Sequence, residues 1–199
     1  MKIILVGASG TIGKQIHEAL SPRHEIITAS LNKGQVKVDI TKPQSIQAMF
    51  TTVGSFDALI SATGSGPFGA ISALTDEDFN DGIRSKLMGQ INLVLTGQKY
   101  IRDGGSFTLT SGILSEEPIA GGTVLSVVNG GLNSFAMAAS AELQRGLRLN
   151  VVSPGIVEDS ADAIGQYFPG HNPVSMQRVV NAYIKSLEGI ENGRVIQVY

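Results

Sequence analysis

The chain has 199 residues, with 15 lysines and arginines against 17 aspartates and glutamates, a net charge of −2 and no cysteine. This balanced charge, without a basic cluster, gives no support for binding nucleic acid or a membrane surface. The lack of cysteine excludes disulfides, thiolate metal sites and a cysteine nucleophile, and we expect no metal site. The length suits a single domain spanning residues 1–199. The apolar run at 3–6 is too short for a signal peptide or a membrane span, so we expect a cytoplasmic protein.

Seven β-branched runs, each ended by turn residues, predict strands. They lie at 2–7, 25–30, 36–40, 57–64, 105–112, 147–155 and 193–199. Helical periodicity separates most of them, at 11–20, 43–52, 76–100, 121–146 and 173–188. Only "LNKGQ" separates the second and third strands, so we expect a loop there. Strands alternating with helices predict an α/β fold with a doubly wound parallel sheet. Residues 158–172 are expected to be irregular and to form a lid.

The segment "VGASGTIG" follows the first strand directly and opens the first helix. Glycines at this position let backbone N–H groups and the helix N-terminus meet a pyrophosphate. The other interpretation is a plain tight turn between a strand and a helix. The context favours a Rossmann-type fold that binds a dinucleotide. The residues expected to hold it here are Gly7, Ser9, Gly10, Thr11, Ile12 and Gly13.

The second strand ends in "TASLNKG", without the acidic residue that would bind an adenosine ribose 2′-OH. Ser30, Asn32 and Lys33 could instead receive a 2′-phosphate, which favours NADP(H) over NAD(H). Two later strand ends should face the same crevice, because ligands of open parallel sheets bind at the carboxyl ends of the strands. Taken alone, each could be an ordinary turn. Their expected cofactor-lining residues are Asp39, Ile40, Ala62, Thr63 and Gly64.

In these ordered motifs the chain resembles the short-chain dehydrogenase/reductase family over nearly its whole length. "VGASGTIG" resembles the family's glycine-rich turn, although its spacing is GxxGxxG where commoner members have GxxxGxG. "DIT" resembles the adenine-contacting turn, "SATG" the Asn-Ala-Gly turn, and "FTLTSG" the strand that carries the active-site serine, here Ser111. "NVVSPGIV" resembles the turn beside the nicotinamide, which implies contacts from Pro154, Gly155 and Ile156. The resemblance implies an NAD(P)-dependent oxidoreductase acting on a small carbonyl or alcohol.

The helix after the serine strand departs from the family pattern. "LSVVNGGLNSFAMAASAEL" aligns with it without a gap, which puts Leu125 at the position of the family's proton-donating tyrosine and Asn129 at that of its lysine. "KLMG" puts Lys86 at the position of the usual catalytic asparagine. Asn129 can hydrogen-bond a ribose, and Lys86 returns one positive charge, so both are candidate catalytic residues beside Ser111. Alternatively, Leu125 merely fills space, Lys86 is a solvated lysine and Ser111 a turn residue.

Two adjacent glycines in the same helix, Gly130 and Gly131, are expected to allow close packing against the serine strand and the cofactor. The missing proton donor could be replaced from the predicted lid, by Tyr167 or His171, although lid residues are also often plain contacts. The alternative to an enzyme is a catalytically silent dinucleotide-binding protein that acts as a sensor or an assembly subunit. The substrate of the enzyme would be a small molecule.

We also expect a homodimer or homotetramer. The helices at 76–100 and 121–146 carry more apolar and small residues than one sheet face needs. The resemblance implies that these two helices form the subunit interface. The residues expected to be exposed there are Leu93, Val94, Phe135, Ala136 and Ala139.

Overall fold

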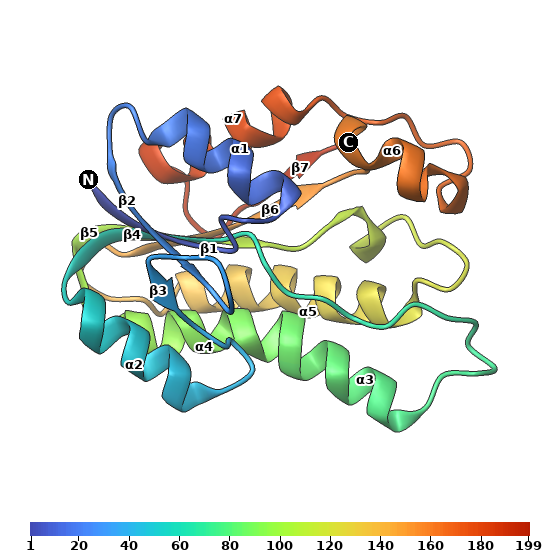
Figure 1. Cartoon of the computed structure of the whole chain (residues 1–199), viewed down its shortest axis with the longest axis horizontal. Helices are drawn as coiled ribbons and strands as arrows, with labels where there is room; N and C mark the ends of the chain where they lie inside the picture. Colours follow the sequence, from blue (N-terminus) through green and yellow to red (C-terminus); the bar gives the residue numbers. More distant parts are fainter.

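The fold is a seven-stranded parallel sheet in the order β3-β2-β1-β4-β5-β6-β7 (Figure 1). The computed structural model describes all residues, 1–199. The strands are β1 (Lys2–Val6), β2 (Glu25–Ser30), β3 (Val36–Lys37), β4 (Phe56–Ser61), β5 (Ile101–Thr110), β6 (Arg148–Pro154) and β7 (Val195–Val198). The strand order reverses between β1 and β4, which opens a crevice at their carboxyl ends. The predicted Rossmann-type fold is confirmed, as is the loop between the second and third strands.

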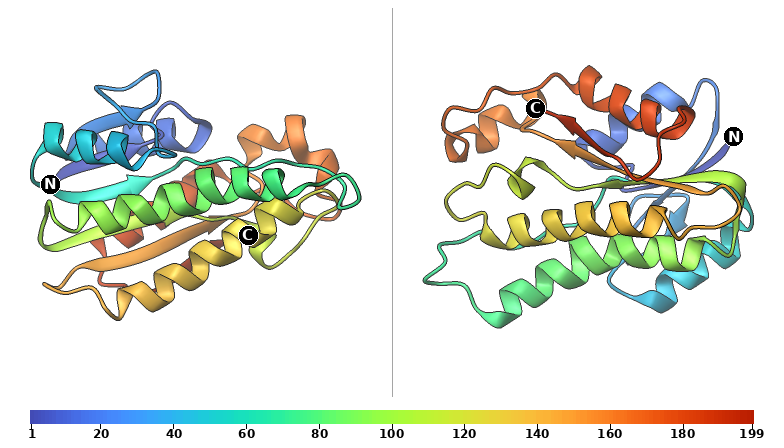
Figure 2. Two further views of the ribbon diagram at one scale, coloured as in Figure 1. Left: turned by 90° about the horizontal axis from the view of Figure 1, so that it is seen from below. Right: turned by 180° about the vertical axis from the view of Figure 1, so that it is seen from behind.

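Helices cover both faces of the sheet (Figures 1 and 2). On one face α1 (Thr11–Leu20) and α7 (Met176–Glu188) pack through residues such as Ile16 and Tyr183. On the other face lie α2 (Pro43–Val53), α4 (Met88–Gly97) and α5 (Thr123–Ser140), with Phe50, Leu93 and Leu132 in a second core. The strands are therefore buried on both sides, as their continuous β-branched runs predict. None of the helices has the length and apolar character needed to cross a membrane.

The segment 76–100 was predicted as one helix and consists of three parts. After α3 (Asp76–Gly82) comes a π-helical turn, η1 (Ile83–Leu87), and then α4. The start of α3 is fixed by a capping box between Thr75 and Asp78. A π-helical turn holds one residue more than an α-helical turn, and such turns occur often at functional sites. Periodicity over the whole segment does not reveal it.

The predicted lid is not irregular throughout, and this part of the prediction is wrong. It contains α6 (Glu158–Ile164) and a 3₁₀ turn, η3 (Gly165–Tyr167). Two acidic residues in the first turn of α6 favour a helix start, but the helix is too short for its periodicity to be recognised. A further 3₁₀ turn, η2 (Ile113–Ser115), follows the serine strand.

The expected exposure of apolar residues on α4 and α5 is wrong for three of the five residues. Leu93, Val94 and Ala136 are buried, and Phe135 and Ala139 are partly buried against the same core. The core needs them because both helices lie flat on the sheet. The large apolar side chains that are about half exposed on these helices are instead Leu95, Val127 and Met137.

Candidate functional site

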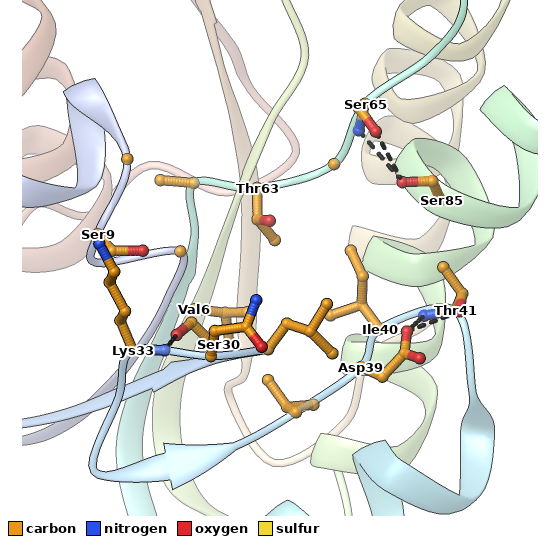
Figure 3. A pocket seen from close by; sticks show the side chains of 17 residues that line it. Val6, Ser9, Ser30, Lys33, Asp39, Ile40, Thr41, Thr63, Ser65 and Ser85 are labelled. Atoms are coloured by element: carbon orange, nitrogen blue, oxygen red, sulfur yellow. Dashed lines mark hydrogen bonds between the residues drawn. The ribbon is translucent and has the colours of Figure 1, made fainter.

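A cavity of about 590 Å³ opens at the carboxyl ends of β1, β2 and β4 (Figure 3). Eleven of its lining residues are predicted cofactor residues: Gly7, Ser9, Gly10, Ser30, Asn32, Lys33, Asp39, Ile40, Ala62, Thr63 and Gly64. The other six lining residues are not among the predicted ones: Val6, Leu31, Val38, Thr41, Ser65 and Ser85. Most of these six are chain neighbours of predicted residues and could have been included. Ser85 comes from η1, far away in the sequence, and no local pattern points to it.

The glycine-rich turn is built for close backbone approach. Gly7 has a φ of +90°, and a side chain there would overlap the backbone of Ala62. A side chain on Gly13 would likewise overlap the carbonyl of Gly7. The first turn of α1 begins at Thr11, with Ile12 and Gly13 behind it, and no side chain caps it. Unpaired N–H groups at a helix N-terminus, reached over glycines, fit a pyrophosphate.

The next turn presents a lysine toward the glycine-rich turn. The Lys33 N–H donates to Ser30 Oγ at 2.9 Å, which fixes the loop after β2. From there the Lys33 side chain extends toward Ser9 (Figure 3). Ser9 and Lys33 also line a smaller cavity of about 280 Å³, to which Lys14 and His17 belong. The only carboxylate lining this smaller cavity is that of Glu18.

The carboxylate of Asp39 is engaged within its own turn. It accepts hydrogen bonds from the N–H of Thr41 at 3.0 Å and from Thr41 Oγ1 at 2.6 Å (Figure 3). It also pairs with Lys42 Nζ at 3.1 Å. The hydroxyl of Thr41, assisted by Lys42, holds the pKa of the Asp39 carboxyl below its usual range. Asp39 therefore stays ionised and shapes the wall of the cavity where β3 ends.

Lys86 lies between the ends of β4 and β5. Its Nζ donates to the backbone carbonyl of Ser111 at 3.2 Å, and it forms no ion pair. A side chain on Gly64, which has a φ of +104°, would displace Lys86. Burial lowers the pKa of the Lys86 ammonium to about 8. The interpretation of Lys86 as a solvated lysine does not fit this placement.

Ser111 and Asn129 each carry a buried polar atom without a partner. Both residues are only 3% exposed, and Ser111 Oγ and Asn129 Oδ1 have no hydrogen-bond partner. The Asn129 side chain faces Gly112, the residue after Ser111. Buried polar atoms without partners are uncommon and call for a ligand or water. The structure thus brings Lys86, Ser111 and Asn129 together, and their free atoms fit the polar groups of a bound cofactor and substrate.

Tyr167 is not part of this cluster. Its ring packs edge-on against Phe68 with centroids 5.1 Å apart, and no hydrogen bond links its hydroxyl to the cluster. His171 lies near Glu117, with Nε2 and Oε2 3.1 Å apart, and packs against Phe168. It lines a cavity of about 200 Å³ together with Gly155, Ile156 and Tyr199. His171 therefore lies beside the turn after β6, whereas Tyr167 lies against the loop after β4. Pro154 itself ends β6.

Leu125 and the two adjacent glycines of α5 have different neighbours. Leu125 lies against Gly66, in the loop after β4. Gly131 faces Leu87 of η1, so α5 approaches the π-helical turn closely. Gly130 has open space around it, and the expected close packing is wrong there. No group of three or more His, Asp or Glu side chains could hold a metal ion.

A buried glutamine that is not among the predicted site residues supports the serine strand. Gln90 of α4 accepts from the N–H of Thr110 and donates to its carbonyl, both at 2.9 Å. It also donates to the carbonyl of Lys86 at 3.2 Å. Gln90 thus ties the residue before Ser111 to the helix that carries Lys86. A lone glutamine in an apolar helical pattern gives only a weak signal of this.

The chain is similar in sequence to known reductases. The family profile described as Enoyl-(Acyl carrier protein) reductase matches residues 7–185. The 3-oxoacyl-[acyl-carrier-protein] reductase FabG of Escherichia coli K12 is 27% identical over 181 residues, covering 79% of this chain and 74% of FabG. An oxidoreductase of Methylorubrum extorquens AM1 is 28% identical over 139 residues, covering 67% of this chain. The chain matches only 56% of the length of that relative.

Solved structures agree over the full chain. The crystal structure of lin1944 from Listeria innocua is 46% identical, with complete coverage of both chains and a TM-score of 0.98. A small-chain dehydrogenase in complex with NADPH is 27% identical, with 100% and 96% coverage and a TM-score of 0.88. With the ordered motifs placed on this sheet and a profile match across residues 7–185, the chain belongs to the short-chain dehydrogenase/reductase family of oxidoreductases.

Proposed function

We propose that the chain, as a single cofactor-binding domain, is an NADP(H)-dependent oxidoreductase that interconverts a small carbonyl compound and its alcohol. One observation carries this proposal. The uncapped glycine-rich turn opens onto a cavity of about 590 Å³, and Lys86, Ser111 and Asn129 meet at the adjoining strand ends. A cradle for phosphates beside free polar atoms suits a bound dinucleotide and a reacting carbonyl group.

The residues of the crevice would have separate roles in cofactor binding and substrate orientation. Bound NADP(H) would supply or accept the hydride. Backbone N–H groups of the turn from Gly7 to Gly13 would hold the pyrophosphate, and Asn129 would hydrogen-bond the nicotinamide ribose. Ser111 Oγ would orient the substrate oxygen. The remaining proposed cofactor contacts are Ser30, Asn32, Asp39, Ile40, Ala62, Thr63, Gly64, Pro154, Gly155 and Ile156.

The preference for NADP(H) rests on the charges beside the glycine-rich turn. Lys33 extends toward Ser9, and Lys14 and His17 line the adjoining small cavity. A 2′-phosphate at this point would gain charge-assisted hydrogen bonds. The relative solved with NADPH supports the same preference. Titration of the protein with NADPH and NADH, followed by nucleotide fluorescence, tests it. Equal or tighter binding of NADH would contradict the preference, and no binding of either would refute the proposal.

A catalytically silent dinucleotide-binding protein is the second candidate, favoured by Leu125. This side chain cannot donate a proton, and it packs against the loop at Gly66. Both candidates bind the cofactor, so the deciding measurement is hydride transfer. Stereospecific transfer from deuterated NADPH to any member of a panel of aldehydes and ketones supports the enzyme. NADPH binding without any transfer supports the silent protein.

We propose a homodimer or homotetramer that is joined through α4 and α5. Leu95, Val127 and Met137 leave an apolar surface on these helices. Leu95→Glu combined with Met137→Glu should reduce the mass measured by light scattering. Ile190→Glu is the matched control, because Ile190 is 96% exposed and lies outside these helices. A wild-type monomer at micromolar concentration would contradict the proposal.

A further inference from the structure

The group that protonates the substrate oxygen has to be found among side chains other than that of Leu125. Tyr167 packs on Phe68 and His171 lies beside Glu117, so neither is held at Ser111. Tyr183 is fully buried on the opposite face of the sheet, where its hydroxyl bonds Thr110 Oγ1 at 2.6 Å. Burial raises the pKa of Tyr183 above its usual range, which makes it a poor donor at neutral pH.

Lys86 is the titratable side chain held directly against the serine residue. Its Nζ lies 3.2 Å from the Ser111 carbonyl, and the backbone of Gly64 supports the side chain from the other side. Gln90 fixes the Lys86 carbonyl and the backbone of Thr110 at once. An ammonium group has three protons, so one hydrogen bond to Ser111 leaves two free to reach a substrate.

We infer that Lys86 is the proton donor of the reaction, replacing the absent tyrosine. This inference rests on the proposed function. Hydride from the reduced nicotinamide nucleotide adds to the carbonyl carbon, and the π electron pair of the C=O bond moves to oxygen. The N–H bond of Lys86 breaks as the new O–H bond forms, and the neutral amine regains its proton from water. The products are the alcohol and the oxidised nucleotide.

The surroundings of Lys86 suit this role. The groups in contact with Lys86 are uncharged: the backbone of Gly64 after β4, the carbonyl of Ser111 just after β5 and the Gln90 amide on α4. The neighbouring cation on the same helix, Arg84, is engaged with Glu77 and Asp81. Burial alone lowers the pKa of Lys86 to about 8. An acid is most effective when its pKa lies near the working pH.

Two variants of Lys86 distinguish the effect of its proton donation from the effect of its positive charge. Lys86→Arg keeps the cation but cannot give up a proton, and Lys86→Met removes both. The exposed Lys99, changed to Met, is the matched control.

The assay follows NADPH oxidation with 9,10-phenanthrenequinone, a reactive dicarbonyl probe. We expect both Lys86 variants to lose a factor of about 10² or more in turnover. Wild-type turnover should fall tenfold per pH unit above pH 8. Full activity in Lys86→Arg would overturn the inference.

A second measurement does not need turnover. Competitive acetylation over a pH range, read by mass spectrometry, should give Lys86 a pKa of about 8 without nucleotide. Titration at the ordinary lysine value of about 10.4 would overturn the inference. Absence of NADPH binding would instead refute the proposed function. If NADPH binds but the probe does not oxidise it, the proposed role of Lys86 is overturned, whereas the proposed cofactor binding is retained.

Discussion

The crevice has two halves that differ in how much of the expected residue pattern they contain. The half at the ends of β1, β2 and β4 keeps the glycine-rich turn and most of the residues expected around it. The half at the ends of β5 and β6 contains Ser111, and the sequence resemblance aligns Leu125, Asn129 and Lys86 with the other three expected positions. The first half consists mainly of backbone and short turns, whereas the second depends on individual side chains. Binding can therefore be maintained while the chemistry changes.

The largest effect that we expect comes from a substitution in the backbone turn of the first half, which should abolish NADPH binding. Gly7→Ala places a methyl group on the Ala62 backbone at a φ of +90°. We expect a loss of more than about 3 kcal/mol in the free energy of unfolding and no measurable NADPH binding. Gly54→Ala is the control, because Gly54 also has a positive φ but open space around it. Because its φ of +70° and ψ of −147° suit glycine, the change should cost about 1 to 3 kcal/mol in urea denaturation, but it should leave binding intact. Equal losses in the two variants would refute the steric explanation.

The second half can be converted to the family pattern. Leu125→Tyr with Asn129→Lys puts both groups on one face of α5, four residues apart. The new lysine would crowd Lys86, and two ammonium groups at one site repel each other. The triple variant that adds Lys86→Asn should therefore reduce carbonyl probes faster than the double variant, and about 10²-fold faster than Lys86→Met. Steady-state NADPH oxidation measures this, and a double variant that matches the triple would contradict it.

A smaller effect is expected from Lys33→Met, which tests the first half through charge alone. Loss of one charge-assisted hydrogen bond should weaken NADPH binding by about 10- to 100-fold and leave NADH binding unchanged. Lys37→Met, at an exposed lysine on β3, is the matched control. Calorimetric titration with both nucleotides gives the comparison. A similar loss for NADH would mean that Lys33 does not bind the 2′-phosphate.

The smallest effect concerns the stability of the nucleotide-free protein as a function of pH. The folded-state pKa of Lys86 is about 8, below the unfolded value of about 10.4, so its charged form is disfavoured in the fold. This destabilisation is fully present below pH 8 and disappears as the pH rises toward 10.4. Relative to Lys86→Met, the wild type should therefore gain about 2 kcal/mol over that range in urea denaturation. A constant difference between the two proteins would mean that Lys86 is not desolvated.

How far the sequence predicts this molecule depends on how local each feature is. The strands, the glycine-rich turn and the loop after β2 follow from short patterns, and the family from the order of those motifs. Short patterns do not predict three other features. These are the burial of Leu93 and Ala136, the short helix α6 and the open space at Gly130. They depend on how helices lie on the sheet.

The site shows the same limit. The alignment singles out Lys86, but its contact with Ser111 depends on a π-helical turn and on Gln90. The position of Ser85 depends on the same π-helical turn, and that of Tyr167 on its packing against Phe68 from the loop after β4. Residues that are distant in the sequence fix these contacts, and no local period reveals them.

The π-helical turn at Ile83–Leu87 also constrains how this protein can change by insertion and deletion. Each residue added to or removed from a helix rotates all that follows by about 100°. A deletion within the turn would make the helix regular, and it would swing Lys86 away from Ser111 or move Leu93 and Val94 out of the core. Substitutions at 86, 125 and 129 do not change the rotation of the helix that places residue 86 beside Ser111 and Leu93 and Val94 in the core. The chemistry of the site is therefore open to gradual change by point mutation, whereas the length of this helix is effectively fixed.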